Sequence, residues 1–308
     1  MKDFRFKLQK YNGIRSRFDC PNCKEKNVFT RYIDTSTGEY LNQDVGRCSR
    51  EVNCGFHYSP KQFFSDNKDL KLTPLFFNCI NNIKPQGISY LGQDLLEKSL
   101  MGKNHNCFVD FLILNFGREI TNQLIDKYKI GASKHWYGST VFWQVDVSGN
   151  IRSGKIMLYN GTTGKRVKKP FNHITWVHSV LKLKDYFLKQ CFFGEHLIKD
   201  NNKPIAITES EKTAIIASVF FPDFVWLAAG SISNLTTEKF RNLKNRKIIL
   251  FPDLNAYEKW KQISTTISTY SMLRVSNYLE VNASDEDREL GLDLADYLLK
   301  LDRNKFQI

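Results

Sequence analysis

The sequence predicts a multidomain protein that combines α+β and α/β architecture, and three observations lead to this fold class. The first 64 residues contain two pairs of cysteines on either side of a hairpin-like pattern. The middle of the chain contains both helical and strand patterns. From Pro204 onward, short apolar strands alternate with helices. We expect a zinc β-ribbon at 1–64, a linker at 65–85, a basic mixed α/β subdomain at 86–200, and an α/β domain with a parallel sheet at 201–308.

The composition is that of a basic globular chain. Its 308 residues include 45 Lys plus Arg against 32 Asp plus Glu, a net charge of +13, and 42% of them are hydrophobic. This content supports a sizeable core and excludes disordered, collagen-like and small disulfide-rich classes. The positive charge favours a polyanionic partner such as nucleic acid. No apolar signal sequence or membrane-spanning stretch is evident, so we expect a cytoplasmic protein with no membrane partner.

Two cysteine pairs flank the predicted hairpin of the first 64 residues. Cys20 and Cys23 have the spacing of a zinc knuckle, and Cys48 and Cys54 follow after a hairpin-length insert with strands at 28–33 and 40–47. Seven cysteines in a chain without an export signal disfavour disulfides. We therefore predict one Zn²⁺ held by these four thiolates. His57 leaves open a second ligand set, in which it replaces Cys48.

The remaining cysteines are Cys79, Cys107 and Cys191. Each lies among apolar residues in the sequence. Because a free cysteine packs as a small hydrophobic residue, we expect all three to be buried without a chemical role.

The middle of the chain changes from helical to strand periodicity. From Ile88 to Tyr128 the apolar residues recur at helical spacing, and Gly131 is expected to stop the helix. A hairpin should follow, with strands at 140–146 and 151–159 around a turn at 147–150.

The pattern of the C-terminal region predicts the order strand, helix, strand, helix, strand. Short buried strands are predicted at 205–208, 225–228 and 247–251, with a helix at 211–220 after the first. Glu209 directly follows the first strand, and Asp253 follows the third. Because the carboxyl ends of parallel strands meet at one edge of a sheet, we expect these two carboxylates to face a common crevice.

These acidic positions resemble the toprim domain of primases, topoisomerases and some nucleases. Glu209 matches the glutamate after the first toprim strand, Asp253 matches the first aspartate of the DxD motif, and Asn255 stands where the second aspartate is expected. The resemblance implies a Mg²⁺ site for phosphoryl transfer, with Glu209 and Asp253 as ligands and all three as catalytic residues. Asp293 and Asp296 either start a helix as solvated acids or join this metal site.

A strongly basic segment precedes the toprim-like strands. Residues 147–184 contain eight Lys or Arg and no Asp or Glu. Such a segment favours contact with nucleic-acid or nucleotide phosphates, and binding of this kind weakens steeply with salt. The residues that we predict to bind nucleic acid are Arg152, Lys155, Lys165, Arg166, Lys168 and Lys169.

The order of zinc ribbon, helix with an Ile-Gly step, basic hairpin and toprim-like strands is similar to that of bacterial primases, and most similar to ribbon-plus-toprim proteins of plasmids and conjugative elements. This resemblance implies a primase-core-like middle region and a primase-like nucleotidyltransferase. Its substrates would be single-stranded DNA and ribonucleoside triphosphates. The resemblance further implies a role in the replication or transfer of a mobile element, with a replicative helicase as a further partner. The alternative is a non-catalytic DNA-binding replication accessory protein with a degenerate toprim site, which Asn255 favours.

Overall fold

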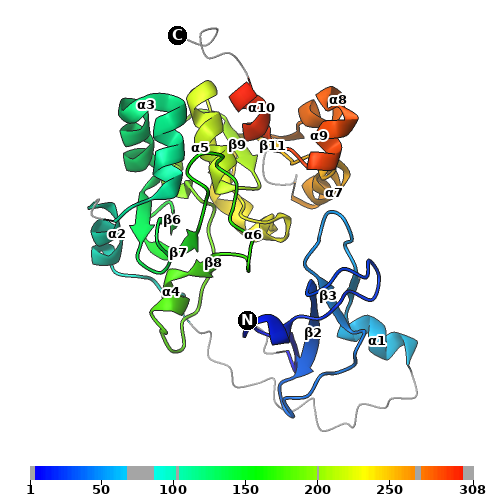
Figure 1. The fold of residues 1–308 in the computed structure, drawn as a ribbon. Helices are drawn as coiled ribbons and strands as arrows, with labels where there is room; N and C mark the ends of the chain where they lie inside the picture. Colours follow the sequence, from blue (N-terminus) through cyan, green and yellow to red (C-terminus); the bar gives the residue numbers. More distant parts are fainter. Residues whose placement is uncertain (1–3, 68–86, 102–103, 200, 268–271, 301–308) are drawn as a thin grey trace. The chain divides into compact units, whose positions relative to one another are not determined.

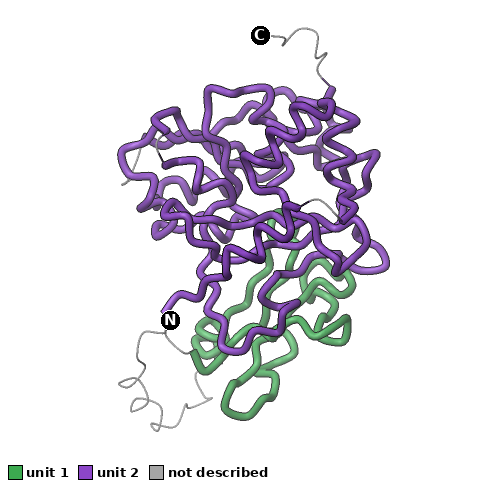
Figure 2. The backbone as a smooth tube through the Cα atoms, turned by 90° about the vertical axis from the view of Figure 1, so that its left-hand side faces the viewer, with its two compact units in different colours: residues 1–86 green, residues 87–308 purple. Residues whose placement is uncertain are grey.

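The computed structural model describes residues 4–67, 87–101, 104–199, 201–267 and 272–300. The chain divides into two compact units, residues 1–86 and 87–308, coloured green and purple in Figure 2. Most of the predicted linker at 65–85 lies outside the described residues, and its first two residues, Ser65 and Asp66, end helix α1 (Pro60–Asp66). Because the linker is mostly undescribed, its bounds stay a prediction.

The first unit is built on a four-stranded antiparallel sheet of order β1-β2-β3-β4, of which Figure 1 labels β2 and β3. Strands β2 and β3 form a hairpin as predicted, with Phe29 paired to Cys48, but the second strand is Gly46–Cys48 and not 40–47, where Tyr40 forms only an isolated bridge to Ile33. Gly46 is required in β3, since a Cβ there would lie 2.3 Å from the Thr30 carbonyl oxygen. The elements are β1 (Phe6–Leu8), η1 (Ile14–Ser16), β2 (Phe29–Asp34), β3 (Gly46–Cys48), β4 (His57–Tyr58) and α1.

The second unit begins with two helices where the sequence predicted continuous helical structure from Ile88. They are α2 (Gln93–Leu100) and α3 (Cys107–Tyr128). The prediction was wrong at its start because Leu91 is extended and its N–H donates to the Ile151 carbonyl at 2.9 Å. Asn106 caps α3 by accepting from the Phe108 N–H at 3.1 Å.

The predicted helix stop at Gly131 was also wrong. Lys129 ends α3 in the left-handed conformation, with φ of 54°. Gly131 instead lies in strand β5 and pairs with Val141. The antiparallel sheet here has the order β5-β6-β7-β8 and contains the predicted hairpin. Its elements and the short helices after them are β5 (Ile130–Ser133), β6 (Ser139–Val145), β7 (Ile151–Met157), β8 (Ile174–Trp176), α4 (Val177–Val180) and η3 (Glu195–Ile198).

A parallel sheet of order β10-β9-β11-β12 follows, and three of its strands lie where the sequence predicted them. Strand β12 was not predicted, since its half-exposed residues lack a continuous apolar run. The elements of this part are β9 (Ile205–Thr208), α5 (Glu211–Phe220), β10 (Val225–Ala228), η4 (Ile232–Asn234), α6 (Thr237–Phe240), η5 (Arg241–Leu243), β11 (Lys247–Phe251), α7 (Tyr257–Ile267), β12 (Met272–Val275), α8 (Tyr278–Asn282), α9 (Asp285–Leu290) and α10 (Leu294–Lys300).

One hydrophobic core joins the antiparallel and parallel sheets of the second unit. Phe142 of β6 and Phe193 pack edge to face with ring centroids 5.6 Å apart, and the backbone of Phe193 pairs with Ala228 at the end of β10. Helices α5 and α10 lie side by side and belong to the same core (Figure 1). The predicted fold class is confirmed, and the boundary predicted between residues 200 and 201 falls within one compact unit.

No helix among the described residues is both long enough and apolar enough to cross a membrane.

Candidate functional site

The four predicted zinc ligands lie together in the first unit. The sulfur atoms of Cys20, Cys23, Cys48 and Cys54 are all within 4.8 Å of one another. Cys48 is brought to the site by the pairing of β3 with β2, and Cys54 by the turn after it, in which its N–H donates to the Arg50 carbonyl at 2.9 Å. Four thiolates in such a cluster fit tetrahedral zinc.

His57 has a different partner. Its Nε2 lies 2.9 Å from the Tyr32 hydroxyl, and its ring stacks on that of Tyr32. The geometry therefore favours the ligand set with Cys48. Burial works to raise the pKa of the Cys54 thiol, but hydrogen bonds from the Asn22 side chain and the Phe56 backbone outweigh it and lower the pKa to about 6. A thiol with a low pKa is readily available as a thiolate ligand.

The three cysteines outside the zinc cluster have different outcomes. Cys191 is buried, as predicted, and Cys79 lies outside the described residues. For Cys107 the prediction of burial was wrong, because it is only half-buried at the start of α3, with its sulfur 3.5 Å from His105 Nε2. The Asp110 carboxylate lies 3.2 Å from the same nitrogen.

The carboxylate cleft is the name that we give to a cavity of 710 Å³ at the carboxyl edge of the parallel sheet. Strands β9 and β11 are neighbours in which Phe251 pairs with Thr208, so Glu209 and Asp253 both leave the sheet at this edge. Ser210 caps α5 by accepting from the Thr213 N–H at 3.1 Å, which fixes the turn that holds Glu209. The acidic residues that line the cleft are Glu209, Glu211, Asp253, Asp293 and Asp296.

Negative charges crowd around Asp253. Burial, and then the carboxylates of Asp293 and Glu209, raise the pKa of Asp253 well above its ordinary value, while Lys212 opposes them. A divalent cation would relieve the repulsion among these three oxygen donors, which are the ligand type that Mg²⁺ prefers. The donor set therefore fits such an ion, and the assignment of Glu209 and Asp253 as its ligands stays a prediction.

Asp293 and Asp296 start a helix, as one of the two interpretations held, but they are half-buried and ion-paired and are not solvated acids. The Lys212 ammonium lies 3.2 Å from a carboxylate oxygen of each. Their side chains also accept from each other's backbone N–H, at 3.0 and 3.1 Å, and so start α10. Burial works to lower the pKa of Lys212, but the two carboxylates outweigh it and raise the pKa, so the ammonium stays charged.

The basic loop, residues 160–169, supplies the opposite charge to the carboxylate cleft. Asn160 orders the loop by accepting at its side chain from the N–H groups of Thr162 and Thr163, at 3.0 and 2.9 Å. Gly164 has φ of +63°, and a Cβ there would lie 2.5 Å from the Phe111 ring, so only glycine fits the close approach to the core. The exposed cations that line the cleft are Lys165, Arg166, Lys168 and Lys169.

Lys155 and Arg152 have acidic partners that the acid-free sequence segment did not reveal. Lys155 lines the cleft, and its ammonium lies 3.0 and 3.2 Å from the two carboxylate oxygens of Glu211. Arg152 Nε donates to the buried Asp146 carboxylate at 2.7 Å. Arg152 lines a different cavity and is not brought together with the other predicted residues.

The hydrogen bond of the Asn255 side chain is to a residue that does not line the carboxylate cleft. Asn255 adopts a left-handed conformation with φ of 65°, its side-chain amide donates to the Arg288 carbonyl at 3.3 Å, and it does not line the carboxylate cleft. The cleft carboxylates beyond Glu209 and Asp253 are Glu211, Asp293 and Asp296, and of these Asp293 acts most strongly on the pKa of Asp253. Glu211 and Lys212 were given no role from the sequence, although this oppositely charged pair begins two residues after Glu209, a position that could have marked them.

Two family models match parts of the chain. Residues 4–69 match a zinc beta-ribbon finger family, which agrees with the cysteine cluster and supports Zn²⁺ as the ion of this unit. Residues 106–254 match a domain of unknown function, DUF6371, and this match includes Glu209 and Asp253. A search among curated protein sequences finds no match to this chain.

Solved primase structures are among those similar to this chain. The primase fragment of the bacteriophage T7 primase-helicase is 16% identical, with 89% of this chain and 98% of that chain covered and a TM-score of 0.37. The Aquifex aeolicus primase, with its zinc-binding and RNA polymerase domains, is 14% identical, with coverage of 92% and 79% and a TM-score of 0.35. A T7 lagging-strand polymerase assembly, which contains primase domains bound to an RNA/DNA hybrid and dTTP, is 18% identical, with coverage of 55% and 83% and a TM-score of 0.33.

Proposed function

We propose that this protein is a primase-like nucleotidyltransferase that joins ribonucleotides on single-stranded DNA at the carboxylate cleft. The observation that carries the proposal is the meeting in one cavity of the carboxylates of Glu209, Asp253 and Asp293 with the cations of the basic loop. Phosphoryl transfer depends on positioning and on stabilisation of negative charge, and this cavity offers groups for both.

Each group in the cleft has a role in this proposal. Glu209 and Asp253 would hold Mg²⁺, which when bound stabilises the negative charge that develops on the transferred phosphoryl group. The exposed cations of the basic loop would hold phosphates of the template or the nucleotide. Lys212 keeps the Asp293 carboxylate in place, and Lys155 does the same for Glu211. A role in the replication or transfer of a mobile element is the setting that we propose, with a replicative helicase as a further partner.

The decisive test is incubation of the full chain with single-stranded DNA, labelled ribonucleoside triphosphates and Mg²⁺ or Mn²⁺. We expect short labelled products from the wild type and none from Glu209→Gln, which removes one negative charge from the cleft. Glu258→Gln is the matched control, because Glu258 is exposed on α7 and does not line the cleft. Equal product yields from both variants would contradict the proposed active site.

The second candidate is a non-catalytic DNA-binding accessory protein. It is favoured by the position of Asn255, which leaves the sequence without the second DxD carboxylate. In the same assay, DNA binding by the wild type without any labelled product, in Mg²⁺ and in Mn²⁺, would support this candidate and overturn the first.

The basic loop gives a further prediction. Replacing Lys165, Arg166, Lys168 and Lys169 by Ala should reduce the slope of log K against log salt for single-stranded DNA by up to ~3, at ~0.7 for each phosphate that is no longer neutralised. The control replaces four exposed lysines that do not line the cleft, Lys182, Lys184, Lys199 and Lys244. Equal slopes for both quadruple variants, measured by fluorescence anisotropy, would mean that the phosphates lie elsewhere.

A further inference from the structure

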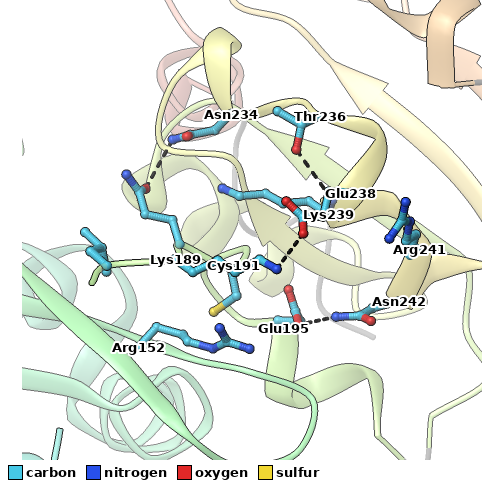
Figure 3. Close-up of a pocket in the computed structure, with 12 residues that line it drawn as sticks. Arg152, Lys189, Cys191, Glu195, Asn234, Thr236, Glu238, Lys239, Arg241 and Asn242 are labelled. Carbon is cyan, nitrogen blue, oxygen red and sulfur yellow. Dashed lines mark hydrogen bonds and ion pairs between the residues drawn. The ribbon is translucent and has the colours of Figure 1, made fainter. Parts of the chain in front are cut away.

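The second pocket is the name that we give to a cavity of 450 Å³ in the second unit (Figure 3). It lies between strand β7, the segment 188–195, and the short helices η4, α6 and η5. Four cations and two carboxylates line it: Arg152, Lys189, Lys239, Arg241, Glu195 and Glu238. Of these residues only Arg152 is among those predicted from the sequence to bind nucleic acid, and the proposed function does not use the pocket.

Both carboxylates of the second pocket already have partners. Glu238 forms an ion pair with Lys189 at 2.5 Å. Glu195 accepts from the Asn242 amide at 3.0 Å and from the Phe192 N–H at 3.1 Å. Arg152 is likewise held by Asp146. Lys239 and the exposed Arg241 are thus the two lining cations without an ion pair in the described structure, and the Glu195 carboxylate, whose hydrogen-bond donors are neutral, offsets one of their two positive charges.

Lys239 is the unusual member of this set. Its Nζ atom is buried and has no hydrogen-bond partner in the described structure, and it lies 5.4 Å from the centre of the Phe192 ring. A buried ammonium without a hydrogen-bonded partner costs free energy, because it has given up its hydrating water and gained little in return. An anion in the pocket would supply the missing acceptor.

The second pocket adjoins the carboxylate cleft. Gly230 lines the cleft, and the position of a Cβ on it would be 3.8 Å from Asn234 Nδ2, which belongs to the second pocket, and 3.8 Å from Lys155 Nζ, which belongs to the cleft. A ligand with several phosphates could therefore reach both cavities past this glycine.

We propose that the second pocket binds a phosphate group, carried by a nucleotide or by a nucleic-acid strand, with Lys239 and Arg241 as its ligands. Phosphate offers several strong acceptor oxygens and a negative charge, which match an unsatisfied ammonium beside a guanidinium. This inference does not depend on metal binding or catalysis in the carboxylate cleft.

The test is calorimetric titration of inorganic pyrophosphate in EDTA into the basic-loop quadruple variant, from which the exposed cations of the cleft have been removed. Lys239→Met in this background should weaken binding about tenfold or more, the reduction expected for a charge-assisted hydrogen bond. Lys244→Met is the matched control, because Lys244 follows the same helices, is exposed and does not line the pocket. The proposal would be overturned if the two variants bound pyrophosphate equally well, or if the basic-loop quadruple variant itself did not bind pyrophosphate.

Arg241→Gln serves as the second variant, since Arg241 is exposed and its replacement spares the core. It should also weaken pyrophosphate binding several-fold, and an unchanged affinity would remove Arg241 from the site. Parallel titrations with a nucleoside triphosphate and with a single-stranded oligonucleotide identify the source of the phosphate, which is the one whose affinity falls with Lys239→Met. Glu209→Gln should not weaken the binding of pyrophosphate, which separates this site from the proposed active site.

The pH dependence of binding gives an independent readout. Burial lowers the pKa of Lys239 to about 8, against the opposing effects of Cys191, Glu195 and Glu211. Arg152, Lys189, Arg241 and Glu238 are the other charged groups that line the pocket. Since the ammonium is charged below this pKa, the affinity should be full near neutral pH and fall several-fold as the pH rises past 8. Lys239→Met should lack this fall, and an identical profile for Lys239→Met and the wild type would count against Lys239 as a ligand.

Discussion

Asp253→Asn is expected to remove the Mg²⁺-dependent stabilisation of the protein and to lower its nucleotidyl transfer by ~10²-fold or more, since a bound metal supplies several kcal/mol of charge stabilisation. The reason is the position of Asp253 among the carboxylates of Glu209 and Asp293. An amide at this position keeps the size of the side chain and removes the charge. The measurement is the melting temperature with and without Mg²⁺, together with the primer-synthesis assay.

The metal-free protein provides a separate check on Asp253. Because its folded-state pKa is raised above the ordinary value, the contribution of Asp253 to the stability of the wild type in EDTA should fall as the pH rises from below that ordinary value through the raised one. Asp253→Asn has no group to titrate there and should lack this component. The free energy of unfolding from urea titrations across the acidic to neutral range measures the difference. If the pH profiles of the wild type and Asp253→Asn were parallel, the neighbouring charges would not raise the pKa of the Asp253 carboxyl.

Asn255→Asp is the control for the effect of charge alone. Its side chain is directed to the Arg288 carbonyl and not to the cleft, so the added carboxylate should leave the Mg²⁺ affinity unchanged. A clear increase in Mg²⁺ affinity would place position 255 at the ion, as the toprim resemblance implies, and would contradict the geometry described above.

Removal of zinc should unfold the first unit and leave the second unit folded. Among the described residues, the hydrophobic cluster around the cysteines has three buried members, which are Cys20, Phe29 and Cys48. So small a cluster needs its metal, and structural zinc contributes ~10–16 kcal/mol in zinc-finger peptides. The second unit has its own extensive core. Hydrogen exchange of the full chain with and without a chelator should therefore show reduced protection only in residues of the first unit.

Cys48→Ser is the genetic form of the same experiment. It should abolish stoichiometric zinc binding, whereas His57→Ala should retain one zinc per chain, because His57 lies against Tyr32 and outside the cysteine cluster. Cys107→Ser, a change in the second unit, is the matched thiol control, and this variant should retain one zinc per chain at the cysteine cluster of the first unit. Stoichiometric zinc in purified Cys48→Ser, or its absence in His57→Ala, would restore the ligand set in which His57 replaces Cys48.

The sequence was sufficient for those features that depend on local pattern. Continuous apolar runs bounded by turns located β9, β10 and β11, and a residue directly after such a strand must leave the sheet at its carboxyl edge, as Glu209 and Asp253 do. The hairpin between the cysteine pairs followed in the same way from strand alternation and turn residues. The local pattern was weaker for β12, whose residues are only half-buried, and for the start of α2, where pairing with β7 keeps Leu91 extended.

Only the tertiary structure decided which charges meet. Lys212 and Asp293 are 81 positions apart in the numbering and come within 3.2 Å because α5 packs against α10. Lys155 of β7 and Glu211 of helix α5 pair in the same way, so the acid-free segment carries less unpaired charge than its composition implies. The second pocket depends on a buried Lys239, which in the sequence is one lysine among many. The physical reason is that hydrophobic periodicity acts over a few residues, whereas the partners of a side chain depend on how distant elements pack in the core.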